Sequence, residues 1–203
     1  KNIKIIAYTV KLGGIRAKKR LLDVIDKNMF YCPDMEAAEK MEERVLQVKK
    51  MGDSIGGIVE ILAKGVPAGL GDPVFDKMDA DLAKALMSIG AVKGVEIGSG
   101  FEAAARLGSE NNDPITPLGF SSNNAGGILA GISNGDDIVV RVAVKPISSI
   151  LIEQETIDTS RKPATISTRG RHDISAIPRI NVVCEAMIGL VLADHLLRQR
   201  AIQ

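Results

Sequence analysis

The apolar residues of this chain change repeatedly between the spacing of a β-strand and the spacing of an α-helix, which constrains the fold more than any other feature. Residues 3–10 are apolar and β-branched and lead to Gly13 and Gly14, which predicts a strand followed by a turn. Residues 33–51 place apolar side chains three and four positions apart, which predicts a helix with one buried face. We expect that face to consist of Met35, Ala38, Met41, Val45, Val48 and Met51.

Further segments continue this alternation. The remaining predicted strands cover 52–65, 91–98, 151–159 and 164–168. A helix over 75–89 has Asp76 or Asp79 near its start, where a carboxylate caps free backbone N–H groups. The buried face expected for this helix comprises Phe75, Met78, Leu82, Leu86 and Ile89.

The last predicted helix runs from residue 179 to residue 199. The side expected to be buried consists of Val182, Met187, Leu190, Val191, Ala193 and Leu197. His195 stands near the C-terminal end of this helix, where a cationic imidazole offsets the helix dipole. This position favours a structural role for His195.

A hairpin is predicted within residues 127–144. Asn134 and Gly135 stand between two apolar runs, and an Asn-Gly pair in that setting is a strong signal for a two-residue turn. Before it, residues 108–122 form a long polar stretch that predicts a loop.

The order of these elements indicates the fold class. Strand, helix, strand, helix and strand are followed by several strands and a terminal helix, an order typical of α+β or α/β proteins. No internal repeat and no shift in composition divides the chain. We therefore predict a single domain over residues 1–203.

Charge and composition exclude several classes of partner. Lys and Arg total 26 against 25 Asp and Glu, so the net charge of +1 creates no long-range field toward nucleic acid or an anionic membrane. Any binding of anions must therefore be local. We expect no membrane span, because no apolar run approaches the roughly 20 residues required. Two cysteines are too few for a disulfide framework, and a reducing cytoplasm is the expected location.

The first residues indicate a longer natural protein. The chain begins with KNIKIIAYTV, which already alternates like a strand, and it has no initiator Met. We expect an N-terminal portion to precede these residues, in preference to a native start left by removal of a tag.

The sequence TRGRHD at 168–173 is the strongest local candidate for a site. Arg169 and Arg171 flank a glycine and suit contacts to phosphate or to an anionic ring. Asp173, beside two guanidinium groups, is expected to be ionised and to act as a base, and His172 titrates near neutrality. From these residues alone, a solvated loop with paired charges is an equally good interpretation.

Two other stretches carry weaker signals. SSNNAGGILAGISNG at 121–135 contains Gly126 and Gly127, which let the backbone approach a ligand, although a plain loop leading into a hairpin is the better interpretation. KPISSI begins at Lys145 and offers a lysine and two hydroxyl groups, on Ser148 and Ser149. A strand end with a surface lysine is the simpler interpretation of that segment in isolation.

Taken together, these residues resemble the C-terminal part of the chorismate synthase family. The matching runs follow the same order and span nearly the whole chain. They are CPDMEAAEKM, GDSIGG, GVPAGLGDPVFDKMDADLAKALMSIGAVKGVEIGSGF, SSNNAGGILAGISNG, KPISSI, RGRHD and EAMIGLVLADHLL. The resemblance implies an α+β fold of mixed layers, in which antiparallel sheets and helices form a truncated β-α-β sandwich.

The resemblance also implies an activity. Members of the family are lyases that eliminate phosphate from 5-enolpyruvylshikimate 3-phosphate to give chorismate, and they require reduced FMN although the reaction has no net redox change. They are homotetramers. No segment of this chain resembles a reductase, which favours an external flavin reductase. The family's N-terminal histidine and its substrate-binding arginines are absent here, so we expect little or no turnover from this chain alone.

Site residues follow from the resemblance by position. FMN is expected to contact Gly90, Ala91, Ala130, Lys145, Pro146, Ile147, Ser148, Ser149 and Arg171. Asp173 is expected to lie next to flavin N5 and to handle its proton, and no metal ligand is expected. The chain departs from the family pattern at four places. Gly90 replaces Asn, Ala130 replaces Gly, Ile147 replaces Thr, and Ile174-Ser175 replaces Pro-Cys.

Three rival interpretations stay open. The first is a flavin- or phosphate-binding module without catalysis on the same scaffold. The second is a metal-dependent phosphoester hydrolase that uses His172 and Asp173, although no second cluster of ligands stands at a suitable spacing. The third is a purely structural fragment that associates through exposed strand edges.

Overall fold

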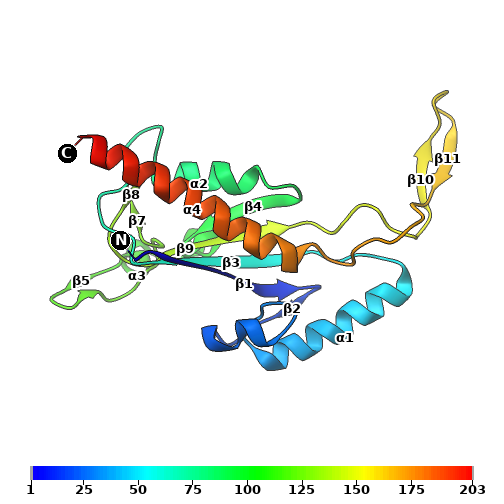
Figure 1. Ribbon diagram of the computed structural model, residues 1–203, viewed down its shortest axis with the longest axis horizontal. Coiled ribbons are helices and arrows are strands. Elements are labelled where there is room, and N and C mark those ends of the chain that lie inside the picture. Colours follow the sequence, from blue (N-terminus) through cyan, green and yellow to red (C-terminus); the bar gives the residue numbers. More distant parts are fainter. Residues whose placement is uncertain (1, 203) are drawn as a thin grey trace.

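An antiparallel sheet of five strands lies at the centre of the structure, a computed structural model that describes residues 2–202 (Figure 1). The strand order is β2-β1-β3-β9-β4, and every neighbouring pair is antiparallel. The strands are β1 (Lys4–Leu12), β2 (Ile15–Arg16), β3 (Gly57–Lys64), β4 (Val92–Ile97) and β9 (Ile138–Val144). Strand β9, distant in sequence, therefore fills the space between β3 and β4.

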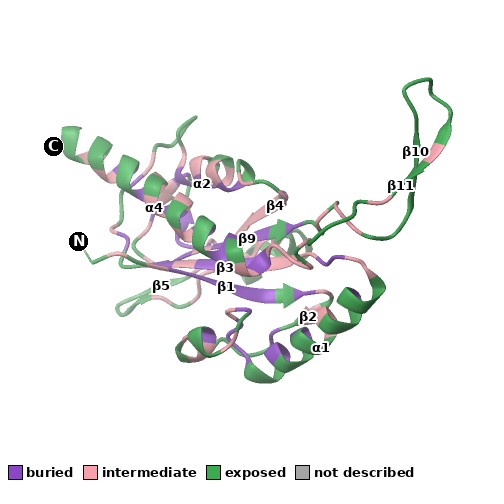
Figure 2. Cartoon of the chain, turned by 45° about the vertical axis from the view of Figure 1, so that its right-hand side comes forward, coloured by how far each residue is buried: buried purple, intermediate pink, exposed green. Residues whose placement is uncertain are grey.

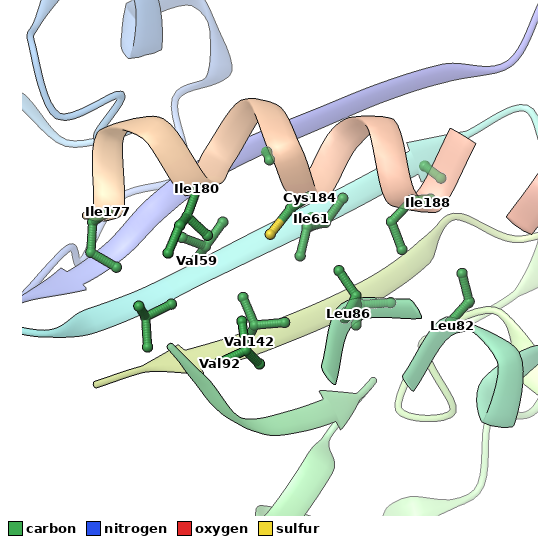
Figure 3. Packing of buried hydrophobic residues seen from close by; sticks show 14 of the residues in the cluster. Val59, Ile61, Leu82, Leu86, Val92, Val142, Ile177, Ile180, Cys184 and Ile188 are labelled. Atoms are coloured by element: carbon green, nitrogen blue, oxygen red, sulfur yellow. The ribbon is translucent and has the colours of Figure 1, made fainter. Parts of the chain in front are cut away.

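Two helices, α2 (Met78–Met87) and α4 (Ile177–Ile202), cover one face of this sheet. Helix α4 packs over β1 and β3, α2 packs over β4, and the two helices contact each other. Figure 3 shows the side chains buried between these layers. They include Val59, Ile61, Leu82, Leu86, Val92, Val142, Ile177, Cys184 and Ile188.

This arrangement is α+β, as predicted. Strands β1, β3, β4 and β9 and helices α2 and α4 all coincide closely with segments predicted from apolar spacing. Within residues 2–202 the helices α2 and α4 have a sheet on one side, so the described part of the chain contains two layers of the expected sandwich.

Helix α1 (Met35–Met51) lies beside the edge strand β2 (Figure 1). It begins at Asp34, whose carboxylate accepts hydrogen bonds from the backbone N–H groups of Ala37, Lys18 and Lys19. It ends at Gly52 in a left-handed conformation. The predicted helix is confirmed, but its buried face is narrower than expected. The buried residues are Ala37, Ala38, Met41 and Val48, while Met35 and Met51 at the two ends are exposed.

Short elements connect the main ones. They are η1 (Leu22–Lys27), η2 (Gly100–Ala105), α3 (Gly108–Asn111), and the hairpins β5–β6 (Ile115–Thr116 and Gly119–Phe120) and β7–β8 (Ile128–Leu129 and Ile132–Ser133). The stretch predicted as a polar loop thus contains α3 and a small hairpin. The hairpin of β10 (Gln154–Ile157) and β11 (Pro163–Ile166), called the arm below, extends away from the sheet and is exposed along most of its length (Figures 1 and 2).

The hairpin expected at Asn134 and Gly135 is wrong in its position. The turn lies at Ala130 and Gly131, which both have positive φ and join β7 to β8. Strand β8 cannot pair with β9 because its Ser133 is already bound elsewhere. The backbone of Ser133 exchanges hydrogen bonds with Gly69 and Leu70.

The buried side predicted for the last helix is wrong for most of its residues, although Met187 and Val191 are partly buried against the core. The exposed fractions of Val182, Leu190 and Leu197 are 59%, 66% and 64%. The buried residues of α4 are Ile177, Ile180, Asn181, Cys184, Ile188, Leu192 and His195. This helix is apolar on two sides, so its periodicity does not indicate which side meets the sheet. For α2, neither Asp76 nor Asp79 caps the helix, because it begins after Lys77 without a side-chain cap, and Phe75 is 90% exposed.

Helix α4 is long and apolar enough to cross a membrane by length and composition, although charged residues interrupt its apolar sequence. Core helices of soluble proteins pass the same test, and the inner side of α4 packs against the sheet. The composition of α4 is therefore weak evidence for a membrane.

Candidate functional site

Two of the segments expected to bind a cofactor lie together at one end of the sheet, where β9 ends and β3 and β4 begin. Val144 pairs with Gly57 of β3 and with Val92 of β4, so the chain leaves β9 between these strands. The backbone N–H of Lys145 then donates to the carbonyl of Ala91 at 2.9 Å. At Gly56, a Cβ would lie 2.3 Å from the carbonyl oxygen of Val144. Only glycine permits this approach, which holds the KPISSI segment against the start of β3.

Further hydrogen bonds hold residues 147–151 against the loop between α1 and β3. The hydroxyl of Ser54 donates to the carbonyl of Ile147 at 2.6 Å, and the N–H of Leu151 donates to the carbonyl of Gly52 at 2.9 Å. Position 52 also favours glycine. Its φ of 72° is left-handed, and an added Cβ would lie 3.0 Å from the side chain of Leu151.

The RGRHD segment joins the same assembly from the other side. The N–H of Thr168 donates to the carbonyl of Ile150 at 3.1 Å, and the N–H of Ile55 donates to the carbonyl of Ile174 at 2.8 Å. The segment between these two anchors contains Arg171 and Asp173. It is therefore placed next to the end of KPISSI although the arm separates the two in sequence.

A cavity of about 250 Å³ lies between these segments. Its lining includes Lys49, Gly52, Asp53, Ser149, Ile150, Leu151, Gly170, Arg171, His172, Asp173 and Ile174. The structure thus brings Ser149, Arg171 and Asp173 to one cavity. Lys145 and Ser148 stand nearby on the exposed side, where the ammonium group of Lys145 donates to the hydroxyl of Ser148 at 3.0 Å.

The partner of Asp173 is a residue that the sequence analysis missed. Arg179, in the first turns of α4, donates from its two terminal nitrogens to the two carboxylate oxygens at 2.6 and 3.3 Å. Arg169 and Arg171, the neighbours of Asp173 in sequence, form no ion pair within residues 2–202. The spacing of six residues between Asp173 and Arg179 crosses a helix start, so no helical pattern signals it.

His172 contributes an unusual feature. Its Nε2 atom is buried and has no hydrogen-bond partner among the described residues. Buried polar atoms are paired in most proteins, and an orphaned one beside a cavity indicates that a polar partner is supplied from outside. This atom, the free guanidinium of Arg171 and the hydroxyl of Ser149 make the cavity suitable for part of an anionic, hydrogen-bonding ligand.

Seven of the expected flavin contacts do not line this cavity, namely Gly90, Ala91, Lys145, Pro146, Ile147, Ser148 and Ala130. Ala130 is separated from the others by the length of α2. It precedes Gly131, whose carbonyl accepts the N–H of Met78 at the start of α2. Ala91 follows the other end of α2, and ten helical residues separate the two positions by about 15 Å. Gly90, beside Ala91, faces open space, with nothing within 4 Å of an added Cβ.

The role expected for His195 also changes. The imidazole is buried, and its Nε2 atom lies 3.1 Å from a carboxylate oxygen of Asp81 on α2. Helix α4 continues to Ile202, so His195 does not stand at the end of the helix. Its structural role is to link α4 to α2, and it lies far from RGRHD in the fold.

Comparison with known proteins decides the family. The family model described as chorismate synthase matches residues 1–197. The chain belongs to the chorismate synthase family. It is 70% identical over 201 residues to a chorismate synthase of Desulfosudis oleivorans, covering 99% of this chain and 57% of that protein. It is 66% identical over 202 residues to that of Desulfatibacillum aliphaticivorans, covering 100% of this chain and 56% of the relative.

A solved chorismate synthase structure has the same fold. It aligns with a TM-score of 0.80 at 36% identity and covers 97% of this chain and 58% of its own. The chain therefore spans little more than half the length of the chorismate synthases that it matches.

Proposed function

We propose that this chain supplies one part of a chorismate synthase active site. The reaction is the elimination of phosphate from 5-enolpyruvylshikimate 3-phosphate to give chorismate, with reduced FMN as the cofactor. The observation that carries the proposal is the shared cavity of Ser149, Arg171 and Asp173 in a chain of this family. These three residues approach one another from segments on either side of the arm.

Arg171 is proposed to hold a negative charge. Its side chain is exposed on the cavity and forms no ion pair within residues 2–202, so its donors are free for a ligand. A guanidinium presents several donors in a fixed plane, which suits phosphate or the edge of an anionic ring. Lys145, with Ser148, offers further donors at the cavity's exposed side. The remaining proposed flavin contacts are Gly90, Ala91, Ala130, Pro146, Ile147 and Ser149.

Asp173 is proposed to move a proton at flavin N5. Two hydrogen bonds from Arg179 fix the orientation of its carboxylate, which is a requirement for a positioned base. When bound, the reduced flavin supplies electron density to the substrate during loss of phosphate and recovers it afterwards. The part of this chain is to orient that flavin, to neutralise charge and to exchange the proton.

The site in this chain is incomplete. Its cavity of about 250 Å³ is smaller than the roughly 300–1,000 Å³ of most ligand pockets. The orphaned Nε2 atom of His172 also lacks its partner. We infer that the rest of the enclosure comes from the remaining length found in the relatives or from other subunits, and that this chain alone does not turn over.

The setting of the activity follows the family. We propose a cytoplasmic homotetramer that receives reduced flavin from an external reductase. One domain over residues 1–203 remains our proposal for this part of the protein. The metal-dependent hydrolase gains no support, since no group of three or more potential metal ligands exists among residues 2–202.

Anaerobic titration of the chain with reduced FMN tests the proposal. We expect Arg171→Gln to weaken binding about tenfold, the cost of one charge-assisted contact. Arg169→Gln is the matched control, because Arg169 stands two residues away and does not line the cavity. Equal losses in both variants would contradict the assignment of Arg171.

A turnover assay separates catalysis from binding alone. The chain is expected to form no chorismate with reduced FMN. In a full-length relative, replacement of the aspartate equivalent to Asp173 by Asn is expected to abolish most turnover while FMN affinity changes little. Full turnover in that variant would show that the aspartate is not catalytic. This chain would then be a flavin-binding module without a catalytic aspartate.

A further inference from the structure

A second and larger cavity lies on the face of the sheet that α2 and α4 leave uncovered. Its volume is about 670 Å³, within the range of small-molecule pockets. Side chains alternate along β3, so Val59 and Ile61 point toward the helices and Glu60 points into this cavity. The residues that line the cavity are Arg16, Ala17, Lys18, Arg20, Glu60, Gly98, Ser99, Glu102, Arg106, Asn123, Asn124, Val139 and Arg141.

The floor of this cavity is a ladder of polar side chains across the sheet. Tyr8, Glu60 and Arg141 stand opposite one another on β1, β3 and β9. The hydroxyl of Tyr8 donates to Glu60 at 2.7 Å, and Nε of Arg141 donates to the other carboxylate oxygen at 2.6 Å. Arg20 donates to the first oxygen at 3.1 Å. The ladder continues to Glu96 on β4, opposite Arg141, with a carboxylate oxygen 3.7 Å from the Arg141 guanidinium. Two carboxylates therefore face two guanidinium groups, and the charges of the floor balance.

The positive charge of the cavity comes from its walls. Arg16 and Lys18, on one wall, are exposed, and their side chains form no hydrogen bond or ion pair within the described residues. On the other wall, Arg106 donates to Ser99 at 3.0 Å and to Asn124 at 2.5 Å. These neutral acceptors fix the guanidinium. Its charge is partly offset by Glu102, which is 3.9 Å away and 71% exposed, and by Asp113, whose pKa the charge of Arg106 helps to lower.

The wall that carries Arg106 is rigid. Asp113 accepts hydrogen bonds from the hydroxyl of Ser122 and from the backbone N–H groups of Asn124 and Ala125, at 2.6–2.8 Å. Next to this loop, the backbones at Gly98 and Gly126 touch, since a Cβ on Gly98 would lie 2.5 Å from the nitrogen of Gly126. The SSNNAGG stretch thus uses glycine for contact between backbones, and its asparagines form a wall.

Five cationic residues and two carboxylates line this one cavity, in a chain whose net charge is only +1. Uncompensated like charges repel, so such a concentration is costly unless a counter-charge completes it. Cations stand on two walls. Arg16 and Lys18, whose side chains are unpaired among the described residues, are on one, and the partly paired Arg106 is on the other. A ligand that satisfies both walls carries at least two negative groups.

We propose that this cavity is an anion-binding site for a small molecule with at least two phosphate or carboxylate groups. It lies on the opposite side of the sheet from α4. Arg141 in its floor is separated from Lys145 by about 13 Å along the strand direction. The proposal uses none of the residues assigned to flavin and does not depend on that assignment.

Calorimetric titration of the chain with pyrophosphate and with citrate, at physiological ionic strength, tests the site. The double variant Arg16→Gln, Lys18→Gln and the single variant Arg106→Gln are each expected to weaken binding about tenfold or more. Arg16 and Lys18 are exposed, so the double variant is expected to fold normally. The probe that binds more tightly identifies the ligand chemistry as phosphate or carboxylate.

A matched control removes the same two charges elsewhere. Lys93→Gln with Arg200→Gln alters exposed residues that do not line the cavity, and we expect binding to stay within twofold of the unmodified chain. Equal losses in the control would show that anion binding depends only on the net charge of the chain, and this would overturn the proposal. Absence of binding by both probes would overturn it too. So would a loss confined to Lys145→Gln, which would place the anion at the flavin candidate site.

Discussion

Nε of Arg141 on β9 lies 2.6 Å from a carboxylate oxygen of Glu60 on β3, on the face of the sheet opposite α4. Glu60 is 7% exposed at its side chain, so this is a nearly buried ion pair. Burial alone raises the pKa of Glu60, but hydrogen bonds from Tyr8 and Arg141 and the charges of Arg20 and Arg141 outweigh burial and hold the pKa below its usual value.

Glu60→Gln is expected to destabilise the chain by about 2 kcal/mol, because it removes the charge-assisted hydrogen bonds that the partly exposed Arg20 and Arg141 donate to this carboxylate. The pH dependence has a definite sign. A carboxyl group whose pKa is lowered by folding contributes stability above its unfolded pKa, about 4.3, and this contribution is lost as the pH falls toward the folded pKa. Urea unfolding between pH 3 and pH 7 is therefore expected to show a shallower acid loss in Glu60→Gln than in the unmodified chain. Glu39→Gln, on the exposed side of α1, is the control and should leave both the stability and the acid loss unchanged.

Glycine substitutions test the contact between backbones beside the larger cavity. Gly98→Ala is expected to cost more than about 1 kcal/mol, because its φ of 57° is left-handed and the new Cβ would meet the backbone of residues 124–126. Gly90→Ala is the matched control, since its Cβ enters open space. Thermal unfolding of the two variants measures the difference. Equal stability in both would show that the crossing at Gly98 is not tight.

The two sides of α4 are expected to respond differently to substitution. Ile188→Ala should cost about 2–5 kcal/mol, because the side chain is 1% exposed in the core. Leu190→Ala, two residues along the same helix, should cost less than about 0.5 kcal/mol because its side chain is 66% exposed. Urea unfolding gives both values, and a reversed order would mean that the other side of α4 faces the sheet.

Gly90→Asn tests the proposed flavin contact by adding a group. Most family members are expected to have Asn at this position, and the space around Gly90 is open, so the new amide fits without strain. We expect reduced FMN to bind about threefold to tenfold more tightly, the effect of one added hydrogen bond. Gly108→Asn, also in open space but away from the site, is expected to change nothing. Weaker binding in Gly90→Asn would argue against flavin at this position.

Local patterns predicted most of the fold. Strands β1, β3 and β4 and helices α1 and α2 follow the apolar spacing that indicated them, because each has one clearly apolar face. Helix α4 was located correctly, but its apolar residues surround it, and only packing against β1 and β3 chooses the side. The Asn134-Gly135 signal failed because Ser133 pairs with a loop more than sixty residues earlier in the chain. Local turn preference carries no information on that competition.

The candidate site was also predicted only where its residues follow one another in sequence. Arg171 and Asp173 were identified within one short motif, and the resemblance assigned the segment after Lys145. Arg179 was missed because its pairing depends on where the chain enters α4. For the larger cavity, the sequence indicated only the SSNNAGG stretch, which supplies Asn123 and Asn124. Its cations were missed, since they come from β2, β9 and two loops that no sequence window contains.

The arm between Ser149 and Arg171 has one further consequence. Its tip, near Arg161 and Lys162, is exposed, while the chain at its base is held by the hydrogen bond from Thr168 to Ile150 and by the anchors at Gly52 and Ile55. A protease that cut the tip would divide the polypeptide into two pieces, each carrying one wall of the smaller cavity. Because α4 stays docked on the sheet, the pieces would remain together, and the residues of the cavity would keep their arrangement after cleavage.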